Sequence, residues 1–367
     1  MHAAAVTAWA DRVRLAGFFA KLAVKEHVAP KLHVRPLVAE LFLTDNCNLK
    51  CVSCACWRTV TRGELDTAEW MGVIDQLAAN GIVKANFTGG EPLLRKDAPD
   101  LIAYARDQGI RSLHLNTNAI LLDDRRRAAV LEAGIRSVNI SVDGPDAEVH
   151  ERIRGVAGSF AKTVANLEKL LDEGRRYRLR VRMNFTVMRS NVESLPEMMR
   201  LAQRLGVRLY LNLATDSTFL FRDQQVSLET RVSDDRVSAV LGEIETLLRQ
   251  DRRHLPSFVE LRYMRGHFGD VLQRGLPCAE SQLKLMVHSR GEIGGCWAHD
   301  GHDNVRDTTI ADMIASARYR DEHAKFYRKE CNGCGSNYSL NLSWRPKSHV
   351  ENLLWRAGRR TLASVPA

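Results

Sequence analysis

The sequence has no long run of apolar residues, and this absence is the first limit on what the protein can do. No stretch of the 367 residues approaches the roughly 18 uninterrupted apolar residues that a membrane span needs. The N-terminal stretch is interrupted by Asp11, Arg12 and Arg14, so we do not expect a signal peptide. We interpret residues 1–35 as a helical segment docked on the rest of a cytoplasmic protein. A membrane-surface or partner-binding role for this helix is the alternative.

Nucleic-acid motifs and low-complexity segments are also missing. The chain carries a net charge of +9, and basic blocks such as residues 174–182 supply much of it. Because acidic residues are interspersed with these blocks and no recognition motif accompanies them, we do not expect nucleic acid as a partner. A solvated face is the usual explanation of such blocks, and an anionic substrate is the functional alternative.

Residues 36–215 alternate between strand-like and helix-like segments. The helix-like segments often open with Asp and close with Gly, which favour the two ends of a helix. Strand-like segments lie at 36–44, 81–90, 110–118, 135–144, 179–188 and 207–215. Such repeats predict parallel strands joined by helices. We therefore expect an α/β fold, a partial (β/α)6 TIM-like barrel.

The remaining residues do not continue this repeat. Residues 216–277 are interpreted as a linker with one helix near 234–252. Residues 278–340 predict a small second domain, with a β-hairpin at 284–296 around Gly291 and a helix near 309–327. Residues 341–367 are interpreted as a helical tail.

Cysteine is grouped rather than scattered. Cys47, Cys51 and Cys54 follow directly on the first predicted strand, at the end of a strand where α/β proteins carry their chemistry. Without an export signal, metal or cofactor binding is a better interpretation than disulfides. A structural zinc ion needs four ligands. Three thiols with no nearby His fit a cubane iron–sulfur cluster that keeps one iron open.

The spacing C-x3-C-x2-C after the first strand of a βα repeat resembles the radical S-adenosylmethionine (SAM) enzymes. Four further stretches resemble that family in the same order: "TGGEP" (88–92), "NTN" (116–118), "SVDGPDAEVHERIRG" (141–155) and "RMNFTVM" (182–188). Ala119 stands where the family often has Gly. The resemblance implies that SAM binds the open iron and is cleaved to a 5′-deoxyadenosyl radical, which abstracts hydrogen from a substrate.

The resemblance also implies a set of SAM-binding residues. Glu91 would hold the amino group, Ser141 the ribose, and Arg154 the carboxylate side, although Arg154 as a loop cap is an alternative. The implied SAM contacts are Gly89, Gly90, Glu91, Thr117, Asn118, Ser141, Arg154, Arg182 and Asn184.

A second set of cysteines lies outside the repeat and resembles the Twitch domain, a shortened SPASM domain. The resemblance implies one auxiliary [4Fe–4S] cluster, and so two clusters in all, with Cys278, Cys296, Cys331 and Cys334 as ligands of the second. A zinc ion with four cysteine ligands is the alternative. The remaining Cys56 is either a small buried residue or a hydrogen-atom donor.

The function implied by this resemblance is oxidation or epimerisation at a carbinol C–H. The substrate would be a small molecule, anionic or sugar-containing: a sugar, aminocyclitol or nucleotide-linked natural-product intermediate. From their position at the end of the sixth predicted strand, we expect Asn212 and Thr215 to contact the substrate. The implied electron donor is a flavodoxin- or ferredoxin-type protein. The alternatives are a peptide-modifying maturase and a non-catalytic zinc-and-cluster protein.

Overall fold

One sheet of nine strands runs through the described part of the chain, in the order β6-β5-β4-β3-β2-β1-β7-β8-β9. The computed structural model describes residues 2–58, 61–214, 232–251, 253–269, 277–296, 303–328, 330 and 345–358. For residues 2–12, 234 and 266–269 only the backbone is described.

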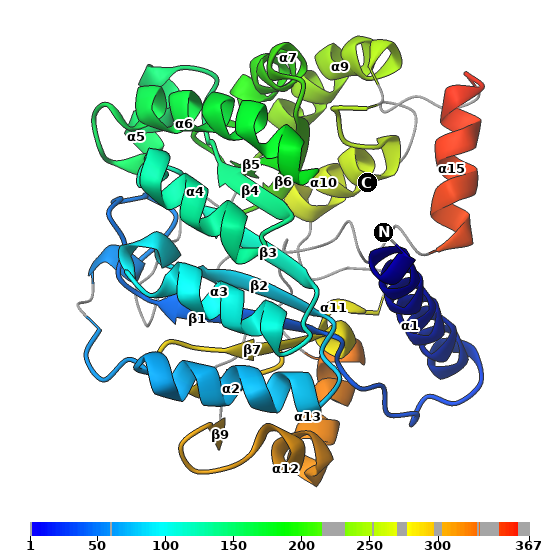
Figure 1. Ribbon diagram of the computed structural model, residues 1–367. Coiled ribbons are helices and arrows are strands. Elements are labelled where there is room, and N and C mark those ends of the chain that lie inside the picture. Colours follow the sequence, from blue (N-terminus) through cyan, green and yellow to red (C-terminus); the bar gives the residue numbers. More distant parts are fainter. Residues whose placement is uncertain are drawn as a thin grey trace.

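The six predicted parallel strands are all present, and each is followed or preceded by a helix as expected. The strands are β1 (Val38–Thr44), β2 (Lys84–Gly89), β3 (Ser112–Thr117), β4 (Ser137–Ser141), β5 (Arg180–Val187) and β6 (Arg208–Leu213). The helices between them are α2 (Thr67–Ala79), α3 (Ala98–Asp107), α4 (Asp124–Ala133), α5 (Ala147–Arg154), α6 (Ser159–Gly174) and α7 (Leu195–Leu205). The predicted partial (β/α)6 barrel is therefore confirmed. In Figure 1 its strands run from right to left, with α2, α3 and α4 in front.

The two faces of this sheet differ in polarity. The side chains that face the helices are apolar and fully buried, and they form one core with helix residues such as Trp70 and Met199. The alternate side chains point to the opposite side and are mostly polar. We call this second side the inner face; its members include Glu40, Asn86, His114, Asn139, Arg182 and Asn184.

The C-terminal part of the chain extends the same sheet. Strand β7 (Lys284–Val287) pairs in parallel with β1, and β8 (Glu292–Gly294) and β9 (Asp303–Asn304) follow antiparallel. The hairpin predicted around Gly291 is confirmed, and this glycine has a φ of 91°, which L-residues with a side chain avoid. Its continuity with β1 was not predicted.

In two regions we predicted one helix and the structure has two. The region 216–277 holds α9 (Asp234–Gln250) and also α10 (Phe258–Gly269). The helix expected near 309–327 is two helices, α12 (Ile310–Ala315) and α13 (Ala317–Arg328), because Ser316 between them is extended, with ψ of 149°. Further described elements are α11 (Glu280–Leu283), α15 (Pro346–Arg356) and the short 3-10 turns η1 (Cys56–Arg58), η2 (Pro92–Leu94), η3 (Arg175–Tyr177) and η4 (Val192–Ser194).

The N-terminal helix α1 (His2–His27) packs on the C-terminal part of the fold. Its Phe18 and Leu22 are buried against Leu283 and Tyr327, which confirms that it is docked. Among the described helices, none has the length and apolarity to cross a membrane.

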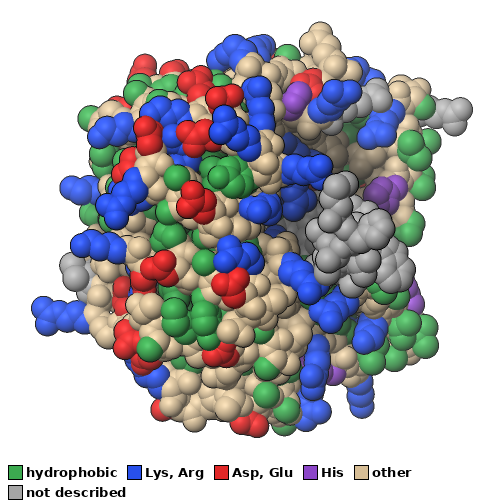
Figure 2. Space-filling model, viewed as in Figure 1, with side chains coloured by type: hydrophobic (Ala, Val, Ile, Leu, Met, Phe, Trp, Pro, Cys, Tyr) green, Lys and Arg blue, Asp and Glu red, His purple; other side chains and the backbone are tan. Residues whose placement is uncertain are grey.

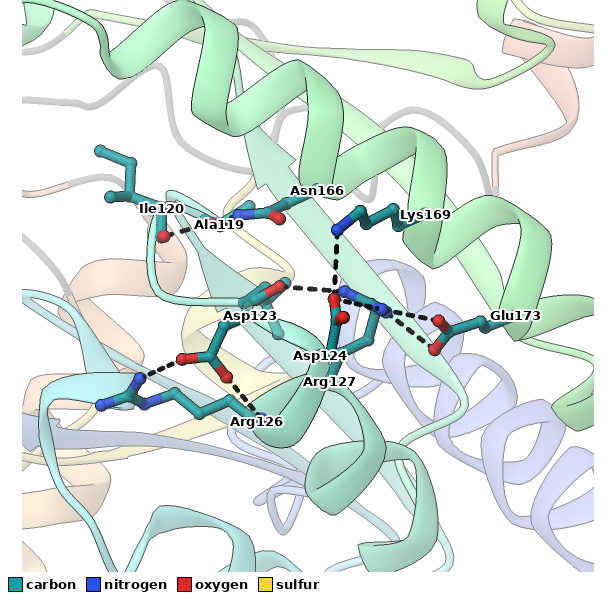
Figure 3. A network of polar contacts seen from close by, with 10 residues as sticks. Ala119, Ile120, Asp123, Asp124, Arg126, Arg127, Asn166, Lys169 and Glu173 are labelled. Carbon is teal, nitrogen blue, oxygen red and sulfur yellow. Dashed lines mark hydrogen bonds and ion pairs between the residues drawn. The ribbon is translucent and has the colours of Figure 1, made fainter.

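A buried arginine ties α4 to α6 (Figure 3). Arg127 is 2% exposed and donates to both carboxylate oxygens of Glu173, at 2.8 and 2.6 Å, and to the Leu122 carbonyl at 3.2 Å. The neighbouring Arg126 instead pairs with Asp123 on the surface, where both side chains are about half exposed. Of the two adjacent arginines, Arg127 is therefore a buried cation that pairs with a half-exposed carboxylate, whereas Arg126 and its partner are both half exposed.

We expect Arg127→Met to lower the free energy of unfolding by about 2 kcal/mol, since it removes charge-assisted hydrogen bonds and leaves a buried carbonyl without a donor. Arg126→Met is the matched control, and we expect it to change the stability by less than about 0.5 kcal/mol because its pair is solvated. Urea denaturation measures both. Equal losses in the two variants would contradict this account.

Candidate functional site

The cysteine loop, residues 45–55, is held first by the turn that follows β2. Gly90 N–H donates to the Thr44 carbonyl at 2.7 Å, and Glu91 N–H donates to the Asn46 carbonyl at 2.8 Å. A Cβ on Gly90 would lie 2.2 Å from the Asn46 oxygen, and one on Gly89 would lie 2.2 Å from the Thr44 oxygen. The two glycines therefore permit a close backbone approach, and the partner in that approach is the cysteine loop itself.

A second glycine turn holds the same loop from the other side. Lys50 N–H donates to the Arg154 carbonyl and Val52 N–H to the Ile153 carbonyl, each at 2.9 Å. Gly155 ends α5 with a φ of 70°, and a Cβ there would lie 2.5 Å from the Lys50 oxygen. Backbone hydrogen bonds from two neighbouring turns thus fix the loop that carries Cys47, Cys51 and Cys54.

The three thiols of this loop lie close together. The pKa of Cys47 is raised to about 12, mainly by burial and in part by repulsion of like charge from Cys51, Glu91 and Cys54. Burial also raises the pKa of Cys51. Among the described residues, no three His, Cys, Asp or Glu side chains meet as ligands of one ion would. A donor set of one buried and two partly buried thiols with no other ligand fits a cluster of several irons, whose positive charge would ionise them.

Glu91 joins the ends of β2 and β3. Its fully buried carboxylate accepts from the Thr117 hydroxyl and the Asn118 N–H, each at 2.8 Å, and from the Leu93 N–H at 3.1 Å. Burial raises the pKa of Glu91 to about 7 despite these bonds. Asn118 in turn donates to Asn48 Oδ1 in the cysteine loop at 2.7 Å. The predicted residues Glu91, Thr117 and Asn118 therefore form one connected group beside the thiols.

The loop after β3 carries backbone strain. Ala119 has a φ of 63°, the left-handed region in which glycine has no steric penalty. Its carbonyl accepts from Asn166 of α6 at 2.8 Å, as Figure 3 shows. This conformation explains in physical terms why glycine suits the position.

Arg154 is a buried cation next to the thiols. Its guanidinium pairs with the fully buried Asp143 at 2.7 Å and reaches Cys51 Sγ at 3.7 Å. Asp143 also accepts from the Thr186 N–H at 2.8 Å, which fixes it to β5. Arg154 Nε has no hydrogen-bond partner among the described residues. Arg154 therefore does more than cap a loop: it brings positive charge to the cysteine loop.

The polar residues predicted on β4 and β5 line the inner face. Ser141 and Asn184 are neighbours in the register of these two strands, and Asn184 Oδ1 is buried without a partner among the described residues. Arg182 lies two residues further from the carboxyl end of β5 and pairs in register with Asn139. Asn212 is half-buried beside Thr186, and Thr215 lies outside the described residues.

The remaining cysteines lie in two places. Cys56 begins η1 and hydrogen-bonds the thiol of Cys54, whose pKa this contact raises. Cys278 and Cys296 both lie beside α13: Cys278 N–H donates to the Tyr327 carbonyl at 3.0 Å, and His323 Nε2 would lie 1.9 Å from a Cβ on Gly295. Cys331 and Cys334 lie outside the described residues.

Several residues of the site were not predicted from the sequence. Asn48 and Asp143 lie in loops, and each joins the site through a contact with a residue distant in sequence or in another element: Asn48 with Asn118, and Asp143 with Arg154. Glu40 and Lys284 form a buried ion pair at 2.7 Å on the inner face. Charged residues at alternate positions of otherwise apolar strands are the signal that could have found this pair, because only an inner polar face accommodates them.

The comparison with known families agrees with this geometry. The model of the Radical SAM superfamily matches residues 41–202, from β1 into α7. The chain belongs to the radical SAM superfamily through this domain. It is a radical SAM enzyme, and the family binds SAM and a [4Fe–4S] cluster.

Relatives of different names cover most of the chain. An "AdoMet-dependent heme synthase" of Nitratidesulfovibrio vulgaris is 27% identical over 82% of this chain and 87% of its own length. A "PqqA peptide cyclase" of Xanthomonas campestris pv. campestris is 29% identical over 82% of this chain and 79% of its own. The solved structure of native anSMEcpe with bound AdoMet is similar in fold, with a TM-score of 0.61, 17% identity, and coverage of 88% of this chain and 97% of that one.

The contact of the Gly155 turn with the cysteine loop can be tested by a substitution with a matched control. Gly155 and Gly158 have nearly the same φ, 70° and 74°, but a Cβ on Gly158 would meet nothing within 4 Å. We expect Gly158→Ala to cost about 1 kcal/mol of unfolding free energy from backbone strain alone. Gly155→Ala should cost roughly 2 kcal/mol more, since its methyl group collides with the Lys50 carbonyl.

Iron content after anaerobic reconstitution separates loop damage from general instability. We expect Gly155→Ala to retain less iron than Gly158→Ala. Equal iron content and equal stability in the two variants would show that the contact with Lys50 does not position the loop.

Proposed function

We propose that this radical SAM enzyme binds its cluster through Cys47, Cys51 and Cys54 and acts on a substrate held at the inner face of the barrel. The observation that carries the proposal is a loop with three thiols, of which Cys51 is buried and Cys47 and Cys54 are partly buried. Two glycine turns hold this loop at the carboxyl ends of the parallel strands. When bound, the cluster and SAM supply a 5′-deoxyadenosyl radical that abstracts hydrogen from the substrate.

We assign the SAM contacts to residues near this loop. The turn Gly89–Gly90 and the group Glu91, Thr117 and Asn118 would receive the amino group, because Glu91 is the buried carboxylate beside Cys47. An ammonium group there would lower the raised pKa of Glu91 and keep it ionised. Ser141 and Asn184 would meet ribose hydroxyls, since Asn184 Oδ1 lacks a partner among the described residues. Arg154 would face the carboxylate.

We assign an auxiliary [4Fe–4S] cluster to Cys278, Cys296, Cys331 and Cys334. The support is that Cys278 and Cys296 both flank α13, which ends at Arg328, shortly before Cys331. A single zinc ion on the same four residues is the alternative. A fully ligated cluster has no site for substrate and would exchange electrons. We expect a flavodoxin- or ferredoxin-type protein as the reductant of the SAM cluster.

For the reaction we propose oxidation or epimerisation at a carbinol C–H of a sugar, aminocyclitol or nucleotide-linked intermediate. The support is the amide-rich inner face, where Asn139 and Asn212 offer hydrogen bonds to hydroxyl groups. The second candidate is modification of a peptide, favoured by the similarity to a PqqA peptide cyclase over most of both chains. A heme synthase is about equally similar, so the scaffold does not select among substrates.

Iron analysis after anaerobic reconstitution tests the assigned ligands. We expect about eight irons per chain in the wild type and about four in a Cys47→Ala, Cys51→Ala, Cys54→Ala variant, because one cubane would be lost. Formation of 5′-deoxyadenosine from SAM should fall below detection in the same variant. Cys56→Ala is the matched control and should keep both clusters. About four irons falling to none would contradict the auxiliary cluster.

A reaction in deuterated water separates oxidation from epimerisation. We expect oxidation, with a product two hydrogens poorer than the substrate and no solvent deuterium, because the candidate donor Cys56 contacts Cys54 instead of the inner face. Mass spectrometry of the product measures both. One deuterium on a product of unchanged oxidation level would instead identify an epimerase and a thiol donor.

A further inference from the structure

Four cations on the inner face form no ion pair with a described acidic residue: Lys84, Arg180, Arg182 and Arg208. Arg180 and Arg208 are exposed, and Lys84 and Arg182 are partly buried. Strand register brings three of them together, since Arg182 pairs with Arg208 on β6 and follows Arg180 by two residues on β5. Lys84 occupies the corresponding side of β2 at its first residue. The four therefore lie toward the amino ends of the strands, away from the cysteine loop.

These cations are close enough to repel one another. Burial lowers the pKa of Arg182, and Arg180 and Arg208 lower it further. Burial is the largest cause that lowers the pKa of Lys84 to about 8. Repulsion from Lys284 and Arg182 also lowers this pKa, and attraction to Glu40 and Glu280 opposes them only in part. The buried acids nearby, Glu40 and Glu280, both pair with Lys284, at 2.7 and 2.9 Å. Grouped cations that form no ion pair repel one another, and an anion that binds among them relieves this repulsion.

Unpartnered polar atoms lie in the same region. His114 and Asn86 are 3% and 5% exposed, yet His114 Nδ1 and Asn86 Oδ1 have no hydrogen-bond partner among the described residues. Asn139 Oδ1, beside Arg182 in the register, also lacks one. Burial lowers the pKa of His114, and the charges of Lys84 and Arg182 lower it further, so His114 lies near both cations. Buried polar atoms without a hydrogen-bond partner, next to cations that form no ion pair, are typical of a ligand site.

We propose that the amino end of the inner face binds an anionic group of the substrate, with Arg182 and Arg208 as its principal contacts and Lys84 and Arg180 beside them. This inference rests on the proposed function and adds a substrate class to it, an elongated anion bearing carboxylate or phosphate. In Figure 2, Lys and Arg side chains border a hollow to the right of the middle, the side on which the strands of Figure 1 begin.

Strand geometry sets the length of this substrate. Arg182 is five residues before Val187, the last residue of β5. At about 3.3 Å per residue, the anionic group lies roughly 15 Å from the carboxyl ends of the strands. The C–H bond that reacts near the cysteine loop and the charge that anchors the molecule therefore belong to opposite ends of the substrate.

Anion binding by the reconstituted holoenzyme tests the proposal, with inorganic pyrophosphate and citrate as separate probes in calorimetry. We expect the wild type to bind at least one probe, more weakly as salt is raised. Arg182→Gln with Arg208→Gln should weaken binding at least tenfold, since charge-assisted hydrogen bonds are lost. Preference for pyrophosphate indicates a phosphate-bearing substrate, and preference for citrate a carboxylate-bearing one.

A matched pair and a stability measurement make the test specific. Arg125→Gln with Arg204→Gln removes the same charge from exposed positions on α4 and α7 and should bind like the wild type. Without anion, the inner-face variant should melt no lower than the wild type, because it relieves repulsion. Binding of neither probe, or equal binding by both double variants, overturns the proposal. Formation of 5′-deoxyadenosine by the wild type, measured separately, tests the proposed function.

Discussion

The close packing of backbone on both sides of the cysteine loop is the constraint on which the rest of the site depends. A loop of three thiols has no secondary structure of its own, so its position must come from neighbours. Here the neighbours are main-chain atoms of two glycine turns, which approach more closely than any side chain allows. Glu91 and Arg154 sit in or beside those same turns. The charges around the thiols are therefore fixed by the contacts that fix the loop.

The second organising feature is the difference between the faces of the sheet. In a closed (β/α)8 barrel, layers of branched apolar side chains fill the interior. Here the main apolar layer lies outside, between strands and helices. The interior instead holds amides, arginines and a buried ion network around Lys284. Stability comes from the outer face, which leaves the inner face free to bind polar molecules.

The sequence predicted local elements well and distant partners poorly. The six strands agree with their predicted segments within a few residues, because each has β-forming apolar residues at alternate positions and is bounded by turn residues. The pairing of β7 with β1 joins residues that no local pattern connects. The contact of Arg154 with Asp143 and Cys51 is equally non-local. The split between α12 and α13 depends on one backbone angle at Ser316, which the sequence does not specify.

The placement of β7 has a consequence for how the chain folds. β1 lies between β2, its neighbour in sequence, and β7, whose Lys284 is 244 residues from the Glu40 carboxylate that it neutralises. Until residues 284–287 arrive, β1 has an unpaired edge and Glu40 lacks its main counter-charge. A nascent chain that has completed the first six strands is therefore still an open sheet with an exposed edge, a state prone to mispairing with other chains. Closure of this edge is a late, long-range step in folding.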